Sequence, residues 1–216
     1  DEIIIGRTPA GRERKDQHLA RETSASGLAA VWARENTREA LWDAMARKEV
    51  YATTGTRLVV RVFGGFDFTA QDLERSDFAE QGYKRGVPMG GDLKSAAAGK
   101  APAFLVHAMR DADGANIDRI QVVKGWLDAS GKTQEKVYDV VWSGDRKPGA
   151  NGKLPPVGNT VNVKEASYTN AIGAPYLTAY WKDPSFDPKL GAFNYVRVLE
   201  IPTPRWTTYD ARIFGV

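Results

Sequence analysis

Apolar residues recur at helical spacing between residues 36 and 48, close to the start of the chain. Asn36 and Glu39 resemble a capping box at the beginning of this helix. The flanking segments 27–32 and 50–54 are β-prone, and a glycine follows the second one. The pattern therefore predicts a strand, a helix and a strand, an arrangement typical of a piece of an α/β domain.

Most of the remaining chain alternates between apolar and polar residues, as half-buried strands do. Short β-prone runs with turn residues between them occur at 57–63, 103–109, 118–127, 134–142, 160–163, 176–181 and 193–201. The third and fourth runs flank a glycine-containing loop and predict a hairpin. The spacing predicts an antiparallel β-sandwich over about residues 57–201. Two prolines then favour an extended tail over residues 202–216.

Composition excludes several chemistries without changing this fold prediction. The 216-residue chain has no cysteine, which excludes disulfides, thiolate nucleophiles and cysteine metal sites. The net charge of +3 comes from interleaved signs rather than a basic face, so we expect no nucleic-acid partner. No apolar run approaches the ~18 residues of a membrane span, so we expect no membrane partner. A cysteine-free chain suits an oxidising compartment, which slightly favours a periplasmic over a cytoplasmic location.

Five segments carry a resemblance to a known family. They are GLAAVWARENTREALWDAMARKEVYATTGTR at 27–57, VVKGWLD at 122–128, VYDVVWSGDR at 137–146, YTNAIGAP at 168–175 and YVRVLEIPTPRWTTYD at 195–210. On these segments the chain resembles the family catalogued as domain of unknown function 3604 (DUF3604). The upstream part of that family's longer members resembles the PHP superfamily, whose metal-dependent phosphoesterase-like barrels bind metal through His and Asp.

The resemblance implies an α+β fold in which residues 1–55 are the C-terminal βαβ piece of a PHP-like barrel. Residues 56–216 would then be the β-sandwich with its extended tail. It also implies a metal-dependent hydrolase whose divalent metal is held mainly by an upstream portion of the protein or a companion chain. This chain would close the barrel and shape the entrance for a small anionic or ester substrate. The alternative is a non-catalytic binding or structural sandwich module that works through an exposed aromatic face.

The candidate metal ligands are few. His18, with Asp16 two residues before it, has a spacing that PHP-like barrels use, but a solvated loop histidine explains it better. We expect His107 to be a histidine bonded within or beside the sandwich core. The acidic segment 110–116 lacks the spacing of a calcium loop and instead predicts a β-turn. We therefore expect no metal site made by this chain alone.

The candidate substrate-binding residues are Arg205, Trp206, Thr54 and Arg57. Prolines around Arg205 and Trp206 restrict the backbone, which suits an arginine that grips an anion and a tryptophan that stacks on a ring. The alternative is that this tail joins the sandwich to the barrel, with Trp206 in an interdomain groove. Thr54 and Arg57, together with Thr53, follow a predicted barrel strand and would face the barrel mouth.

No catalytic set of known type can be assembled from the sequence, so the catalytic residues stay unknown. The abundant aromatic residues invite a carbohydrate-binding interpretation, yet most of them fall inside predicted strands. Packing in the core explains these residues better: Trp126, Tyr138, Trp142, Tyr180, Trp181 and Tyr195.

Overall fold

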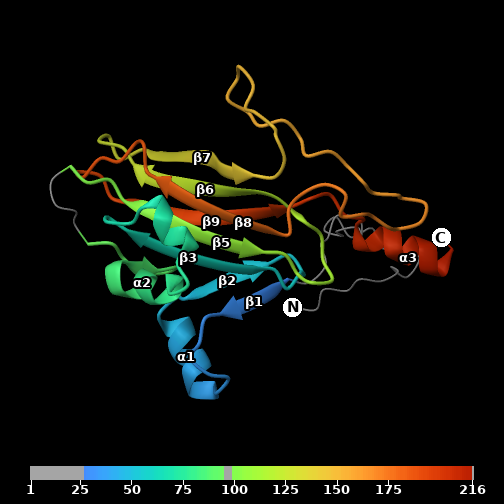
Figure 1. The fold of residues 1–216 in the computed structure, drawn as a ribbon, viewed down its shortest axis with the longest axis horizontal. Coiled ribbons are helices and arrows are strands. Elements are labelled where there is room, and N and C mark those ends of the chain that lie inside the picture. The colour runs from blue at the N-terminus through green and yellow to red at the C-terminus, as the bar shows by residue number, and fades with distance from the viewer. Residues whose placement is uncertain (1–26, 95–98, 216) are drawn as a thin grey trace, which may run out of the picture.

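The computed structural model of the chain describes residues 27–94 and 99–215. Figure 1 shows a β-rich body with short helices at its periphery. The possible ligand pair Asp16 and His18 lies outside the described residues.

Two antiparallel sheets form the body. One sheet has the order β4-β3-β5-β8, with bounds Val87–Pro88, Val59–Gly65, Ala103–Met109 and Tyr176–Lys182. The other has the order β7-β6-β9, with bounds Thr133–Trp142, Ile117–Leu127 and Ala192–Glu200. The predicted antiparallel, sandwich-like arrangement is confirmed, and so is the hairpin formed by β6 and β7.

The main core lies between the two sheets. Val60, Val106 and Ala108 of the four-stranded sheet are buried in one cluster with Ile120 of the facing sheet. Burial of the valine and isoleucine side chains contributes roughly 1.5–3 kcal/mol each. The core is therefore built from the apolar positions of the alternating pattern that the sequence shows.

A second cluster covers the opposite face of the four-stranded sheet. The 3₁₀-helix η2 (Ala70–Glu74) and the helix α2 (Phe78–Arg85) pack there over Phe63 and Leu105. Gly82 of α2 lies against the Phe63 ring so closely that any side chain at position 82 would collide with it. The strand β3 is thus covered on both faces.

The predicted strand–helix–strand is present as β1 (Leu28–Val31), α1 (Arg38–Ala46) and β2 (Val50–Thr53). The two strands pair directly and antiparallel, from Leu28 opposite Thr53 to Val31 opposite Val50. A βαβ unit of a barrel has parallel strands that need a long crossover, so the parallel unit was the wrong prediction. The helix also begins one residue later than expected, because Thr37 rather than Asn36 accepts the capping bond from the Ala40 amide.

A polar and aromatic cluster fastens this β1–β2 unit to the sandwich. The Trp32 indole donates to the Val60 carbonyl at 2.9 Å, and the Arg61 guanidinium lies 4.0 Å from the centre of the Trp32 ring. Glu49, which is only 2% exposed, accepts a hydrogen bond from the Tyr83 hydroxyl and lies 4.0 Å from Arg61. The β1–β2 unit is therefore anchored through the Trp32 indole and the buried Glu49 carboxylate.

The predicted extended tail is wrong over most of its length. The helix α3 (Trp206–Phe214) begins directly after Pro204 and Arg205 and ends at Gly215, whose φ of 69° is typical of a helix terminus. Proline before the first turn is compatible with a helix that starts after it, because its fixed φ suits that position. The expected strand at 160–163 is reduced to a single bridge between Asn162 and Ser167.

None of the helices in residues 27–94 and 99–215 is both long enough and apolar enough to span a membrane.

Candidate functional site

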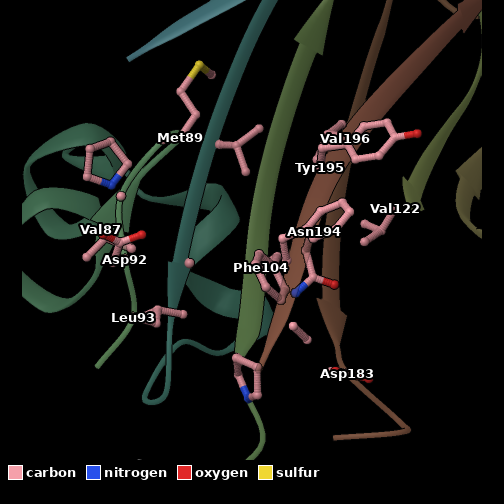
Figure 2. Close-up of a pocket in the computed structure, with 18 of the residues that line it drawn as sticks. Val87, Met89, Asp92, Leu93, Phe104, Val122, Asp183, Asn194, Tyr195 and Val196 are labelled. Atoms are coloured by element: carbon pink, nitrogen blue, oxygen red, sulfur yellow. The ribbon is translucent and has the colours of Figure 1, made fainter. Parts of the chain in front are cut away.

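A groove of about 910 Å³ opens along one side of the sandwich. Strands β3 and β4 and the following loop form one wall, and β9 forms the other. Strand β2 closes one end, and the connection from β8 to β9 lines the remainder. Figure 2 shows this space between β9 and the four-stranded sheet. Its size falls in the range of ligand and peptide sites.

The groove walls are mainly apolar because they are the inner faces of the two sheets. Val62 and Phe104 come from the four-stranded sheet, and Val122 and Val196 come from the three-stranded sheet. Elsewhere in the sandwich such positions face the opposite sheet and are buried. The groove is thus a section of the core that the described residues leave open.

Asn194 supplies a polar group inside this apolar space. Its side chain comes from β9, and Figure 2 places it near Phe104. The side-chain oxygen is buried without a hydrogen-bond partner among the described residues. A buried acceptor without a partner costs about 1–3 kcal/mol. A bound group that donates a hydrogen bond would remove this cost once the amide turns toward the groove.

A buried ion pair borders the same groove. The Lys124 ammonium donates to the Asp183 carboxylate at 2.6 Å and to the Ser185 carbonyl at 2.8 Å. Asp183 lies on the groove lining, directly after β8. The pair holds the β8–β9 connection against β6 and so fixes the position of that wall.

The predicted binding residues do not line this groove; the described lining includes neither Thr54 nor Arg57, and neither Arg205 nor Trp206. Arg57 instead lies in the loop between β2 and β3, where its side chain is exposed. Its backbone amide and Nε both donate to Asp111, at 2.8 and 3.4 Å, and its Nη2 donates to Asp113. The Arg57 backbone bond is the main reason why the pKa of Asp111 lies below its ordinary value.

Thr53 and Thr54 have different environments in this loop. The Thr53 hydroxyl donates to the Thr56 carbonyl at 2.6 Å and accepts from the Gly55 amide, so it shapes the turn. Thr54 is exposed. The segment 110–116 beside it forms the predicted turn, in which the Gly114 amide donates to the Asp111 carbonyl.

Arg205 and Trp206 lie at the start of α3, where Arg205 is the N-cap residue and is exposed. Trp206 is half-buried as the first residue of the helix. Arg212, near the other end of α3, pairs with Glu165 at 2.5 Å. These residues therefore belong to a helix that lies along the surface and not to an extended arm.

Glu200, at the end of β9, is a residue that the sequence interpretation missed. Burial raises the pKa of its carboxyl, the Asp111 charge raises it further, and a hydrogen bond with Thr56 opposes the shift. One of its oxygens is buried without a partner in the described part of the chain. The sequence signal for a buried carboxylate was the position of Glu200 between Leu199 and Ile201 in an apolar run.

The raised pKa of Glu200 predicts a pH-dependent stability. A raised folded-state pKa means that the unfolded chain releases this proton first, so stability falls as pH rises above the ordinary value of 4.5 and through the folded value. Glu200→Gln should therefore raise the melting temperature near neutral pH and leave it unchanged near pH 4. Thermal unfolding at both pH values measures this. An equal gain at both pH values, or the same gain in the exposed control Glu135→Gln, would contradict the assignment to ionisation.

His107 is a structural residue of the second core cluster. Its Nε2 lies 3.1 Å from the Leu73 carbonyl, its Nδ1 lies 2.7 Å from the Tyr176 hydroxyl, and its ring stacks on Phe78 at 3.8 Å. The prediction of a histidine bonded beside the core is confirmed. Burial lowers the pKa of His107, which favours the neutral ring.

The described residues do not fit the divalent metal that the resemblance implies. Within residues 27–94 and 99–215, no three His, Asp or Glu side chains converge in a way that could hold a metal ion.

A comparison with protein families matches most of this chain. The model of a family described as "Protein of unknown function (DUF3604)" matches residues 5–216. The chain belongs to this family. A search of the curated proteins finds no match to the DUF3604 chain, and a search of the solved structures also finds none.

Three of the segments that carry the DUF3604 resemblance meet at one end of the sandwich. Thr56 comes from the first segment, Tyr168 from the fourth and Glu200 from the fifth. Thr56 forms a hydrogen bond with Glu200. Burial raises the pKa of Tyr168, and Tyr209 and Glu200 make smaller contributions in the same direction. Together with Arg57 and Asp111, these residues form what we call the loop cluster. It contains the predicted residue Arg57 and is separate from the groove lining.

Proposed function

We propose that this chain is the C-terminal portion of a metal-dependent, phosphoesterase-like hydrolase. In this proposal an upstream PHP-like barrel portion holds the divalent metal, and the junction lies near residue 55. The β1–β2 unit with α1 packs against that portion. The loop after β2, with Thr54 and Arg57, then contributes to the entrance for a small anionic or ester substrate.

The observation that supports this proposal is the exposed apolar surface of α1 and β1. Trp42 is 69% exposed, and Met45 and Leu28 are also exposed. Trp42 and Met45 lie three residues apart on α1, so they share one face of the helix. A large exposed apolar patch marks an interaction site. We call this surface, defined by Leu28, Trp42 and Met45, the α1 face.

The isolation of α1 supports the same conclusion. The helix has nine residues, of which only Ala44 is buried, and β1 is the element that it chiefly contacts. Figure 1 shows α1 projecting from the body of the sandwich. Helices this short are marginal in water unless other parts of the protein cover one face. A covering partner is therefore expected on the α1 face.

The proposal is tested by comparing this chain with the longer protein that includes the upstream portion. The longer protein should contain a stoichiometric divalent metal and hydrolyse a chromogenic phosphate ester, whereas the 216-residue chain should do neither. Trp42→Glu in the longer protein should lower hydrolysis by about tenfold without loss of metal, because misplacement of entrance groups is costly to catalysis.

Asp43→Lys is the matched control, since it changes charge on the same helix outside the α1 face. It should leave hydrolysis unchanged. A longer protein without metal, or equal activity in the 216-residue chain alone, would overturn the proposal.

A second candidate function, a non-catalytic binding module, is favoured by an aromatic surface on the outer face of β9. Phe193 is 63% exposed and lies parallel to Tyr195, with ring centres 6.4 Å apart. The Phe193 ring lies directly over Gly125, where the lack of a side chain allows this close approach. Tyr195 is thus an exception to the expectation that these aromatics pack in the core. A flat pair of this kind suits stacking on a ring-shaped ligand.

A further inference from the structure

We propose that the groove receives an extended segment of the upstream portion of the protein, which adds as a strand to the free edge of β9. This inference rests on the proposed function, because it names a second place where the upstream portion binds. The ligand is thus a peptide segment with alternating apolar side chains and not a small molecule.

The position of β9 provides the backbone for such pairing. Among residues 27–94 and 99–215, β9 (Ala192–Glu200) pairs with β6 on one side only and is the terminal strand of its sheet. Residues 192–196 line the groove. An edge strand presents unpaired amide and carbonyl groups that can pair with another strand. In the described part of the chain, the groove therefore has a hydrogen-bonding edge along one wall.

The two sheets differ in width, and the groove lies where the narrower one ends. In the part of the chain that the structure describes, the sheet β4-β3-β5-β8 has four strands and β7-β6-β9 has three. Strand β8 contacts β7 and β6 across the sandwich, so the wider sheet extends beyond β9 on the side of β3 and β4. One added strand next to β9 would make the sheets equal and would complete the layer.

The walls match the side chains of a strand in this position. A strand added to β9 directs every second side chain toward the four-stranded sheet. There these side chains would meet Val62 and Phe104, which are apolar residues of the groove wall. Recognition by strand addition works in this way, with backbone bonds for affinity and alternate side-chain pockets for selectivity.

The buried oxygen of Asn194 is an independent observation that points to a missing partner. It lies among apolar neighbours and has no hydrogen-bond donor in the described residues. Rotation of the Asn194 amide toward the groove would let a donor group on the incoming segment satisfy it. Selectivity of the groove should therefore include one polar residue within an otherwise apolar strand.

The upstream portion is favoured over a second copy because the groove is continuous with the α1 face. Val50, Tyr51 and Ala52 of β2 line one end of the groove. Strand β2 pairs with β1, which carries Leu28 of the α1 face. A partner seated on the α1 face is thus adjacent to the groove and can extend into it without a separate docking event.

The test is hydrogen exchange, measured by mass spectrometry on peptides of the 216-residue chain and of the longer protein. We expect exchange in β9 to slow by at least about tenfold in the longer protein, as newly paired edge amides become protected. Protection of α1 and β1 should appear in the same comparison. This joint protection of β9 and of the α1 face supports the inference.

The other outcomes separate the two proposals. Protection of α1 and β1 without β9 would overturn the strand addition while the proposed function stands. Protection of neither would overturn the docking that both proposals require. Protection of β9 in the 216-residue chain that rises with its concentration would assign the groove to a second copy and overturn this inference.

Matched variants of β9 sharpen the result. Asn194→Asp places a charge inside the groove, whereas Arg197→Gln lowers the charge by the same amount on the exposed outer face. In the longer protein, Asn194→Asp should return β9 exchange to the rate of the 216-residue chain and leave α1 protected. Arg197→Gln should keep β9 protected. Equal behaviour of the two variants would overturn the role given to the groove.

Discussion

Asp183→Ala is expected to lower the free energy of unfolding by about 3–5 kcal/mol, which is the cost of leaving one member of a buried ion pair without its partner. The Lys124 side chain is 5% exposed and that of Asp183 is 1% exposed, and their charged atoms lie 2.6 Å apart. Removal of the carboxylate leaves the ammonium with the Ser185 oxygens as its remaining partners. Chemical denaturation of the purified chain measures the loss.

The double variant Lys124→Met with Asp183→Leu separates charge from packing. Apolar replacement of a whole buried pair is often neutral or stabilising, so the double variant should recover most of the lost stability. Asp145→Ala, at an exposed position, should change stability by less than about 0.5 kcal/mol. A small effect of Asp183→Ala would contradict the burial of this pair.

Glu49→Ala is expected to cost about 2–3 kcal/mol, since hydrogen bonds to a buried charged group are among the stronger ones. The variant removes the acceptor of the Tyr83 hydroxyl and the opposite charge beside Arg61 and Arg47. Because these contacts join the β1–β2 unit to the sandwich, the loss should be local. Exchange should accelerate at residues 28–53 more than in β6 or β7.

Glu74→Ala is the matched control for this variant because Glu74 is an exposed glutamate at the end of η2. It should leave exchange at residues 28–53 unchanged. Uniform acceleration across all strands in Glu49→Ala would show that the residue supports the whole fold and not the attachment of one unit.

The sequence pattern predicts the elements whose pairing partners are close in sequence or whose residues are buried along most of the strand. The run 103–109 coincides with β5, because this strand lies inside its sheet between β3 and β8 and is apolar except for His107. The hairpin β6–β7 was also predictable, since a five-residue loop 128–132 sets its pairing locally.

Pairing between distant or reversed segments was not predictable in the same way. Strands β1 and β2 carry β-prone residues in either orientation, and only the path of the chain through α1 makes them antiparallel. In the tail, Pro202 and Pro204 dominate the local pattern, although they precede α3 and do not interrupt it. Whether the tail is extended or helical depends on the position of the prolines relative to the start of the helix.

The candidate sites show the same limit. Arg57 was identified from its place after a β-strand, but its partner Asp111 is 54 residues away in sequence. Asn194 follows the ordinary alternation of β9, and its isolation arises only because the facing sheet is wider. Such properties belong to the arrangement of sheets and not to any short stretch of residues.

The pairing of β6 has a consequence for the order of folding. On one side β6 meets β7 through a short loop, and on the other it meets β9, which follows much later in the chain. Closing the short loop costs far less chain entropy than closing the long one. The β6–β7 hairpin can therefore form first, while the β9 wall of the groove is among the last parts to be completed, so folding should be slow for a chain of this size.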